Sequence, residues 1–378
     1  MKGEASWPGQ CFAPFSLHRR EKMEIANLTF IVTDDCNYNC SYCRQKKEKK
    51  TITREIIRAA VDFFYPYLKS SDKIRIGFYG GEPLLAFDKI KYAVLLLLGK
   101  NKKENKNLGF TMTTNGSLLT GEMPEFFNAH GFAVQLSFDG LAQDKGRKKG
   151  SLPHMLRVMK QIQAHPGIAF EINSVFSPQT AGDLSDSLRF IIEQGGPDIT
   201  FNLSSTEKWN PADLETLKKE MERLADYLAF YYKETGRIPV KNFRPPVSKR
   251  GVSRCSAGVD HMAVTPEGKL WGCFLFHDYF KTREDDPEYR EYSFGNLNDF
   301  TRDYETRYPG IMANYSELRQ DFFQVEGNNC FLCPEKEACR VCPINAAYAT
   351  GSVGQIPCQK CHLMKIEKNA ISDLQKLL

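Results

Sequence analysis

Residues 27–45 read NLTFIVTDDCNYNCSYCRQ, an apolar run followed at once by three cysteines. The run over 27–33 is rich in β-branched and aromatic residues, which predicts a buried strand. Cys36, Cys40 and Cys43 follow it with C-x3-C-x2-C spacing. Three thiolates this close can hold one face of a cubane iron–sulfur cluster and leave its fourth iron open, whereas structural zinc normally takes four protein ligands. The stretch therefore predicts iron–sulfur chemistry in the loop after a strand.

Five further strand candidates alternate with helical segments downstream of this loop. The strand candidates cover residues 73–80, 108–114, 132–138, 168–176 and 198–204. The helix candidates cover residues 54–68, 85–98, 152–164 and 183–194. Apolar strands alternating with helices indicate a parallel sheet covered by helices. We therefore predict an α/β fold, a partial (β/α)6 TIM-like barrel with its chemistry in the loops after the strands.

Length and composition limit the remaining classes. At 378 residues the chain exceeds the size of one hydrophobic core, so a domain with a substantial appendage is expected. The longest aliphatic run, residues 93–98, is too short to span a membrane, and the first residues lack the apolar core of a signal peptide. These features predict a cytoplasmic protein. The net charge of +5 arises largely from basic runs at 45–50 and 99–106, which we interpret as solvated surface without a nucleic-acid partner.

The order of segments suggests three parts. They are an N-terminal extension (1–24), the barrel (25–235) and a cysteine-rich domain (236–378). Asn210 before a proline predicts the start of a long helix, and the proline-rich segment 235–251 suggests a boundary. Residues 266–268 suggest a hairpin turn, after which we expect little regular structure until a closing helix over 363–378. Cys11 receives no role.

The first cysteine cluster resembles the signature of the radical S-adenosylmethionine (radical SAM) superfamily, CxxxCxxC, with Tyr42 at its usual aromatic position. The stretch Gly80-Gly81-Glu82-Pro83, after the second strand, matches that family's GGEP motif. The resemblance implies that the glycines let the backbone approach the methionine moiety of S-adenosylmethionine. It also implies that Glu82 accepts a hydrogen bond from the ammonium group of that moiety.

Two shorter stretches extend the resemblance through the barrel. Asn115 lies in a TNG motif after the third strand, and Ser137 opens an S-x-D-G motif after the fourth. Arg147 follows, as in relatives where such an arginine and the serine hold the cofactor carboxylate. The resemblance implies a catalytic [4Fe-4S] cluster whose open iron binds S-adenosylmethionine. Reductive cleavage then gives a 5′-deoxyadenosyl radical that abstracts hydrogen from a substrate.

The C-terminal cysteines resemble the SPASM extension, which carries two auxiliary iron–sulfur clusters in radical enzymes that act on peptides. That resemblance assigns one cluster to Cys255, Cys273 and Cys342. It assigns the other to Cys330, Cys333 and Cys339 with either Cys358 or Cys361. The string departs from the family by ending C-x2-C where C-x3-C is common.

Two alternatives for these residues stay open. Cys339, Cys342, Cys358 and Cys361 have the spacing of a zinc ribbon. His261 stands where relatives with a fully ligated first auxiliary cluster carry a further cysteine. It is either an iron ligand or a histidine that is packed or exposed without binding metal.

The resemblance implies a maturase that forms an oxidative thioether or carbon–carbon cross-link in a ribosomally made peptide. Formylglycine formation, of the anaerobic sulfatase-maturase type, is the first alternative. Those enzymes place an aspartate base directly after the cysteine equivalent to Cys273, but here Phe274 follows and Asp278 is the nearest downstream acid. Maturation of a haem or quinone cofactor is the second alternative, and a non-catalytic electron carrier is the third.

The expected partners are a peptide or protein substrate and a flavodoxin- or ferredoxin-type reductant. Thirty-five residues precede Cys36, too few for the winged-helix module that grips leader peptides in many maturases. We therefore expect leader recognition by the barrel mouth, by the C-terminal domain or by a separate leader-binding protein.

Overall fold

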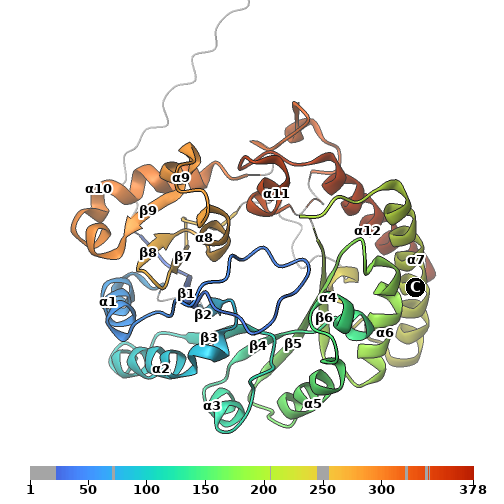
Figure 1. Ribbon diagram of the computed structural model, residues 1–378, viewed down its shortest axis with the longest axis horizontal. Helices are drawn as coiled ribbons and strands as arrows, with labels where there is room; N and C mark the ends of the chain where they lie inside the picture. Colours follow the sequence, from blue (N-terminus) through green and yellow to red (C-terminus); the bar gives the residue numbers. More distant parts are fainter. Residues whose placement is uncertain are drawn as a thin grey trace, which may run out of the picture.

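A nine-stranded sheet forms the centre of the molecule (Figure 1). The computed structural model describes residues 23–69, 73–204, 206–244, 255–319, 322–336, 339 and 341–378. The strands are β1 Asn27–Thr33, β2 Ile74–Gly80, β3 Leu108–Thr114, β4 Ala133–Ser137, β5 Ala169–Phe176, β6 Asp198–Leu203, β7 His261–Val264, β8 Lys269–Trp271 and β9 Ser293–Asn296. Their order across the sheet is β6-β5-β4-β3-β2-β1-β7-β8-β9.

Strands β1 to β6 pair in parallel with their neighbours in sequence order, which confirms the predicted α/β, TIM-like barrel. All six carboxyl ends therefore lie at one edge of the curved sheet. Thr33, at the end of β1, pairs with Gly80, at the end of β2. This register brings the cysteine loop and the GGEP segment together, because both begin where those strands end.

Strands from the cysteine-rich region extend the same sheet. β7 pairs in parallel with β1, with Leu28 opposite Met262, and β8 and β9 add in antiparallel fashion. The hairpin between β7 and β8 confirms the predicted turn at 266–268. The predicted boundary near residue 235 therefore falls between strands of one sheet, and the division into three domains stays a prediction.

Helices surround the outer face of the barrel strands (Figure 1). They are α1 Arg54–Phe64, α2 Phe87–Asn101, α3 Met123–Ala129, α4 Gln143–Gly146, α5 Leu152–Gln163, α6 Leu184–Glu193 and α7 Pro211–Thr235. Helix α7 shows how local sequence sets an element. The Asn210 side chain accepts from the Asp213 amide at 3.0 Å while the Asp213 side chain accepts from the Asn210 amide at 2.9 Å. This reciprocal cap confirms the predicted start of the long helix.

The expectation of little regular structure after the hairpin was wrong. The region contains α8 Phe274–Phe280, α9 Pro287–Tyr292, α10 Leu297–Ser316, α11 Pro343–Thr350 and α12 Cys358–Leu377, and a two-stranded ribbon of β10 Gln324–Val325 and β11 Asn328–Asn329. Helix α10 is hard to recognise in the sequence, because Pro309 interrupts its helical pattern. The helix is also kinked, with non-helical backbone torsions at Asp303. Its buried contacts are aromatic, with Tyr315 fully enclosed against Phe276 and Phe294.

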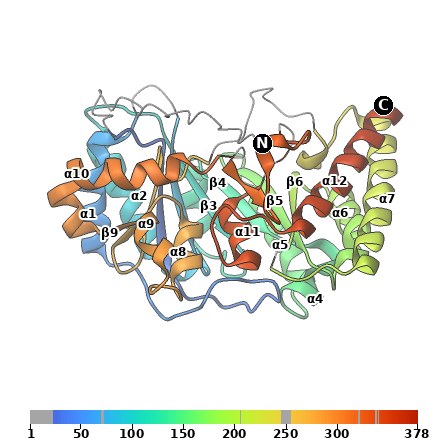
Figure 2. The ribbon, with the colours of Figure 1, turned by 90° about the horizontal axis from the view of Figure 1, so that it is seen from above.

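The last helix returns to the barrel. α12 packs along α7, as both views show (Figures 1 and 2). Within the described ranges, no helix combines the length and the apolar character needed to cross a membrane.

Candidate active site

The loop after β1 carries the three predicted catalytic cysteines on the face that is nearest the viewer in Figure 1 and along the lower edge in Figure 2. Its backbone is held locally: the Cys36 amide donates to the Asp35 carboxylate at 2.8 Å, and the Cys43 amide to the Cys40 carbonyl at 3.1 Å. Asp34 anchors the start of the loop. These bonds give the thiols a defined arrangement.

The two glycines of the GGEP segment lie directly against this loop. The Gly81 amide donates to the Thr33 carbonyl at 2.9 Å. A Cβ at Gly81 would lie 2.2 Å from the Asp35 carbonyl oxygen, and one at Gly80 would lie 2.0 Å from that of Thr33. Gly80 also has a φ of +143°. The glycines are therefore required for the close approach of two protein segments, and their predicted contact with a methionine moiety stays a prediction.

Glu82 is fully buried beneath the site. Its carboxylate accepts from the Leu84 amide at 3.1 Å, the Thr114 hydroxyl at 2.5 Å and the Asn115 amide at 2.7 Å. Burial raises the pKa of this carboxyl to about 6. Glu82 thus ties the GGEP segment to the TNG segment, and its predicted hydrogen bond with a ligand ammonium stays a prediction. Pro83 begins a short 3-10 turn behind it.

Asn115 links the TNG segment to the cysteine loop. Its side-chain amide donates to the Asn37 Oδ1 atom at 2.9 Å and lies 3.9 Å from the Cys36 sulfur. Asn37 in turn donates to the Ser117 hydroxyl at 2.8 Å. The loops after β1, β2 and β3 therefore form one hydrogen-bonded unit.

Tyr42 and Arg147 meet at a buried carboxylate. The Tyr42 hydroxyl donates to Asp139 at 2.6 Å, and the Arg147 guanidinium donates to the other Asp139 oxygen at 2.9 Å. The guanidinium also lies over the Tyr42 ring, 5.5 Å from its centroid. Burial raises the pKa of Tyr42 well above its ordinary value, so this phenol stays a neutral donor.

These loops enclose a cavity of about 500 Å³ at the carboxyl edge of the strands. Most of the predicted site residues line it together: Cys36, Cys40, Tyr42, Cys43, Gly80, Gly81, Asn115, Ser137 and Arg147. Glu82 and Pro83 lie behind the wall and do not line it. A cavity of this size accommodates a small cofactor with part of a substrate.

The residues around this cavity fit an iron–sulfur cluster with a carboxylate-bearing cofactor. Burial raises the pKa of Cys40 to about 11, and a bound metal ion would favour its thiolate form. The Arg147 Nε–H is buried and has no hydrogen-bond partner among the described residues. Arg147 lines the cavity in which a carboxylate is expected, and this donor is left unused by the protein.

Helix α8 forms a wall of the cavity that motif matching did not assign. Phe274 packs on Tyr79 with 3.8 Å between ring centroids, and Asp278, one turn later, lines the same cavity. Asp278 accepts from the Gln45 amide at 3.2 Å and from the Tyr79 hydroxyl at 3.3 Å. Burial raises the pKa of Asp278 to about 6. The i, i+4 spacing was the available signal, since it places both side chains on one helical face.

The C-terminal helices supply the opposite wall. Arg44 donates to Asn345 at 2.5 Å and lies 5.1 Å from the Tyr348 ring centroid, so the cysteine loop contacts α11. These three residues and Lys360 of α12 line the cavity. The cysteine-rich region therefore completes the site. No sequence signal revealed this, because the contacts join residues some three hundred positions apart.

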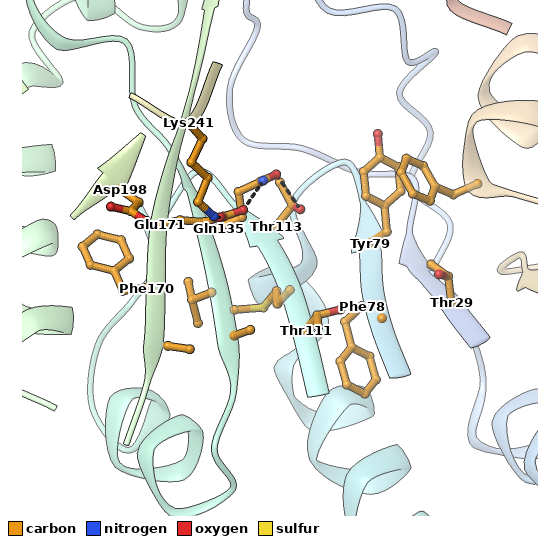
Figure 3. Close-up of a pocket in the computed structure, with 16 residues that line it drawn as sticks. Thr29, Phe78, Tyr79, Thr111, Thr113, Gln135, Phe170, Glu171, Asp198 and Lys241 are labelled. Atoms are coloured by element: carbon orange, nitrogen blue, oxygen red, sulfur yellow. Dashed lines mark hydrogen bonds and ion pairs between the residues drawn. The ribbon is translucent and has the colours of Figure 1, made fainter. Parts of the chain in front are cut away.

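A second cavity of about 380 Å³ lies inside the barrel, and Figure 3 shows its lining. Gln135 accepts from the Thr113 hydroxyl at 3.3 Å and donates to Glu171 at 2.7 Å, while Lys241 pairs with the same carboxylate. Tyr79, Thr113 and Gln135 line both cavities. The barrel interior is therefore polar below the site, in contrast to the bulky aliphatic layers usual in TIM barrels.

The auxiliary cysteines fall into two groups in space. Cys255, Cys273 and Cys342 lie close enough to influence one another's ionisation, and all three are partly buried. Cys330 lies within range of Cys333 and Cys361, and packs with Cys361 in a small apolar cluster. Both groups agree with the ligand sets that the resemblance implies, although the number of clusters stays a prediction. The thiol of Cys358 lies 3.9 Å from the His362 imidazole, and the choice between Cys358 and Cys361 as the ligand stays a prediction.

The contacts of these thiols do not favour the zinc-ribbon alternative, which stays untested. Cys342 lies with the first group and Cys361 with the second. Tetrahedral zinc bound by thiolates would bring the sulfurs to about 3.8 Å from one another. Among the described residues, no set of three potential ligand atoms within 4.8 Å of one another includes a cysteine.

The side chain of His261 contacts the neighbouring strand. Its imidazole lies 3.0 Å from the Thr29 hydroxyl, on the neighbouring strand β1. Burial lowers the pKa of His261 to about 4. These contacts favour the interpretation of His261 as a packed, neutral histidine.

One acidic cluster outside the site has a structural explanation. Asp34, Glu48 and Glu267 bring carboxylate oxygens within 4.8 Å of one another. Lys50 lies 2.9 Å from both Glu48 and Glu267, and Lys281 lies 2.6 Å from Asp34. Each carboxylate thus has a lysine partner, and these ion pairs explain the cluster without a metal.

Sequence comparison identifies a known domain in this chain. The Radical SAM superfamily matches residues 30–191. The radical SAM cyclopropyl synthase TigE of Paramaledivibacter caminithermalis is 23% identical over 347 residues, which cover 82% of this chain and 66% of that protein. The uncharacterized protein MJ0907 of Methanocaldococcus jannaschii is 28% identical over 54% of this chain and 72% of its own length. A probable GTP 3′,8-cyclase of Methanothermobacter thermautotrophicus is 27% identical over 68% of this chain and 87% of its own length.

Solved structures share the fold over most of the chain. The protein anSMEcpe with bound AdoMet and Cp18Cys peptide is similar with a TM-score of 0.71 and 18% identity, covering 94% of this chain and all of its own. SuiB of Streptococcus suis, bound to its precursor peptide SuiA, is similar with a TM-score of 0.55 and 16% identity. The match covers 86% of this chain and 73% of the SuiB chain. At these identities the likeness concerns the fold. Together with the cysteine loop and its cavity, the sequence match leads to one conclusion: residues 30–191 match the Radical SAM superfamily, and the chain is an enzyme.

Proposed function

We propose that this enzyme is a peptide maturase that uses S-adenosylmethionine to generate a radical and forms an oxidative thioether or carbon–carbon cross-link in its substrate. The observation that carries the proposal is the cavity of about 500 Å³. It joins the three thiols of the β1 loop to walls supplied by α8, α11 and α12, the region that also holds the auxiliary cysteines. The catalytic thiols thus face a cavity whose other walls come from the region that holds the auxiliary cysteines.

Each part of the cavity has a proposed task. Cys36, Cys40 and Cys43 would hold the catalytic [4Fe-4S] cluster, and Ser137 and Arg147 would hold the cofactor carboxylate. The cluster supplies the electron that cleaves S-adenosylmethionine. The surrounding walls orient the substrate and exclude water.

The proposed auxiliary clusters would take the surplus electron of an oxidative cross-link. Their proposed ligands are Cys255, Cys273 and Cys342 for one cluster, and Cys330, Cys333, Cys339 and Cys361 for the other. The grouping of these thiols in space supports the assignment. Two fold neighbours hold peptides, which supports a peptide substrate: anSMEcpe is bound to Cp18Cys and SuiB to SuiA.

The proposal is tested with the reconstituted, anaerobic enzyme and a candidate peptide encoded beside its gene. The enzyme reduced with dithionite should form 5′-deoxyadenosine, and the co-expressed peptide should lose the mass of two hydrogens. Formation of 5′-deoxyadenosine with an unmodified peptide would contradict the maturase assignment for that peptide. A reduced enzyme that forms no 5′-deoxyadenosine would contradict radical chemistry altogether.

Asp278 favours one second candidate, formylglycine formation. The sequence argument against it was that Phe274 replaces the aspartate expected after Cys273. In the structure Asp278 reaches the cavity one turn later, with its pKa raised to about 6 by burial. A sulfatase peptide carrying Ser or Cys at the target position distinguishes the two functions. Conversion of that residue to an aldehyde would favour formylglycine formation, whereas a ring or cross-link would favour the maturase.

A further inference from the structure

Two basic segments that are far apart in the sequence meet beside the catalytic cysteines. Residues 44–50 contain five basic residues and one acidic residue, and residues 145–149 contain four basic residues and no acidic one. The Ser41 amide donates to the Gly146 carbonyl at 2.9 Å, which joins the cysteine loop to the second segment. In both ribbon views the loop runs up to α4, where that segment begins (Figures 1 and 2). We call these two segments the basic rim.

The cations of the basic rim are not all neutralised within the protein. Lys49 and Lys149 are exposed and form no hydrogen bond or ion pair with any described residue. Lys148 is also exposed, with its ammonium 5.0 Å from the Tyr38 ring centroid. Two nearby acids are already paired: Glu48 with Lys50 at 2.9 Å, and Asp183 with Lys145 at 2.7 Å. A third, Asp144, accepts from the backbone amides of residues 150–152. The rim therefore projects positive potential into solvent.

The rim is also the surface close to the predicted electron entry point. Cys43 is exposed, and Lys46 follows it by three residues, so their Cα atoms lie at most about 11 Å apart. The proposed function requires an external one-electron donor for the catalytic cluster. A donor protein bound on this rim would bring its redox centre close to Cys43.

We propose that the basic rim is the docking surface for an acidic electron-donor protein that reduces the catalytic cluster. This inference rests on the proposed function, because only a cluster at Cys36, Cys40 and Cys43 gives the donor a target. Charge complementarity selects an acidic partner and increases its rate of association, with little need for a large apolar interface. One electron passes from the reduced donor to the cluster, so the donor is oxidised by one electron and no bond is formed.

The test reverses one exposed charge in each segment, with the variant K49E/K149E. The matched control is K102E/K103E, two exposed lysines without a partner among the described residues. They lie between α2 and the start of β3, at the opposite edge of the parallel strands. Both variants change the net charge equally, so a general effect of charge would appear in both.

Two readouts are measured with reduced flavodoxin, an acidic donor, over a range of salt concentrations. They are the bleaching of cluster absorbance, which reports reduction directly, and the formation of 5′-deoxyadenosine. At low salt we expect K49E/K149E to lower the second-order rate constant of cluster reduction about tenfold relative to wild type. Added salt should make the two rate constants more similar, because it screens the charges. The control should match the wild type. Dithionite, a small inorganic reductant, should support equal 5′-deoxyadenosine formation in all three proteins.

Equal reduction of the wild type and K49E/K149E by flavodoxin would overturn the proposal. An equal loss with dithionite would also overturn it, because the rim would then support the site itself. A higher KM for a substrate peptide under dithionite would assign the rim to an acidic peptide instead. If the wild-type cluster were reduced but no 5′-deoxyadenosine formed, the proposed function would be refuted. The rates of cluster reduction in the wild type and in K49E/K149E would still show whether the donor docks on the basic rim.

Discussion

Replacing Gly81 with alanine should displace the catalytic cysteine loop without unfolding the protein. The added Cβ would lie 2.2 Å from the Asp35 carbonyl oxygen and 2.9 Å from the Cys36 Cβ atom, whereas real Cβ atoms essentially never approach closer than 3.0 Å. The two segments must therefore separate by about 0.8 Å at this contact. Such overpacking costs about 1–3 kcal/mol of unfolding free energy. A displacement near 1 Å at a catalytic group can lower the rate about 10²-fold.

The assay compares G81A with wild type after anaerobic reconstitution, by iron and sulfide content, by the electron paramagnetic resonance signal of the reduced cluster, and by 5′-deoxyadenosine formation. We expect an altered signal and a rate about 10²-fold lower. G99A is the matched control, because nothing lies within 4 Å of its added Cβ, and alanine within a helix should stabilise by up to about 1 kcal/mol. Wild-type iron content and rate in G81A would refute the steric argument.

Three further predictions concern charge and metal. D34A should lower the free energy of unfolding, measured in urea, by about 3 kcal/mol. The reason is that the Lys281 side chain, which is 9% exposed, loses its ion-pair partner at 2.6 Å. A decrease of less than about 1 kcal/mol would contradict a stabilising buried ion pair. Burial raises the pKa of Asp278 to about 6, so the folded state binds the proton of this carboxyl more tightly than the unfolded state does. The free energy of unfolding of the wild type should therefore fall by about 2–3 kcal/mol as the pH rises from about 4 to about 7. D278N should not show this decrease in the free energy of unfolding. Parallel curves of unfolding free energy against pH for the two proteins would refute the assignment to Asp278. C40A should abolish 5′-deoxyadenosine formation because two thiolates remain, whereas C333A should retain uncoupled formation without product; equal loss in both would make the second domain chiefly structural.

The clusters of cysteines and the alternation of strands and helices were readable from the sequence because their signals are local. Three thiolates within eight residues after an apolar strand indicate a cluster loop wherever that strand lies. The cap at Asn210 likewise set the start of α7 through residues three positions apart. Such features depend on spacing along the chain, which the sequence contains directly.

The tertiary structure decided how distant segments combine. Only folding places β7 beside β1, brings Cys342 near Cys255 and Cys273, and brings Asp278 into the cavity of the cysteine loop. It also seats Glu82 under Asn115, where a carboxylate expected to face a ligand is enclosed by protein donors. These outcomes depend on packing and desolvation between segments up to about three hundred residues apart, and neither quantity is encoded in local spacing.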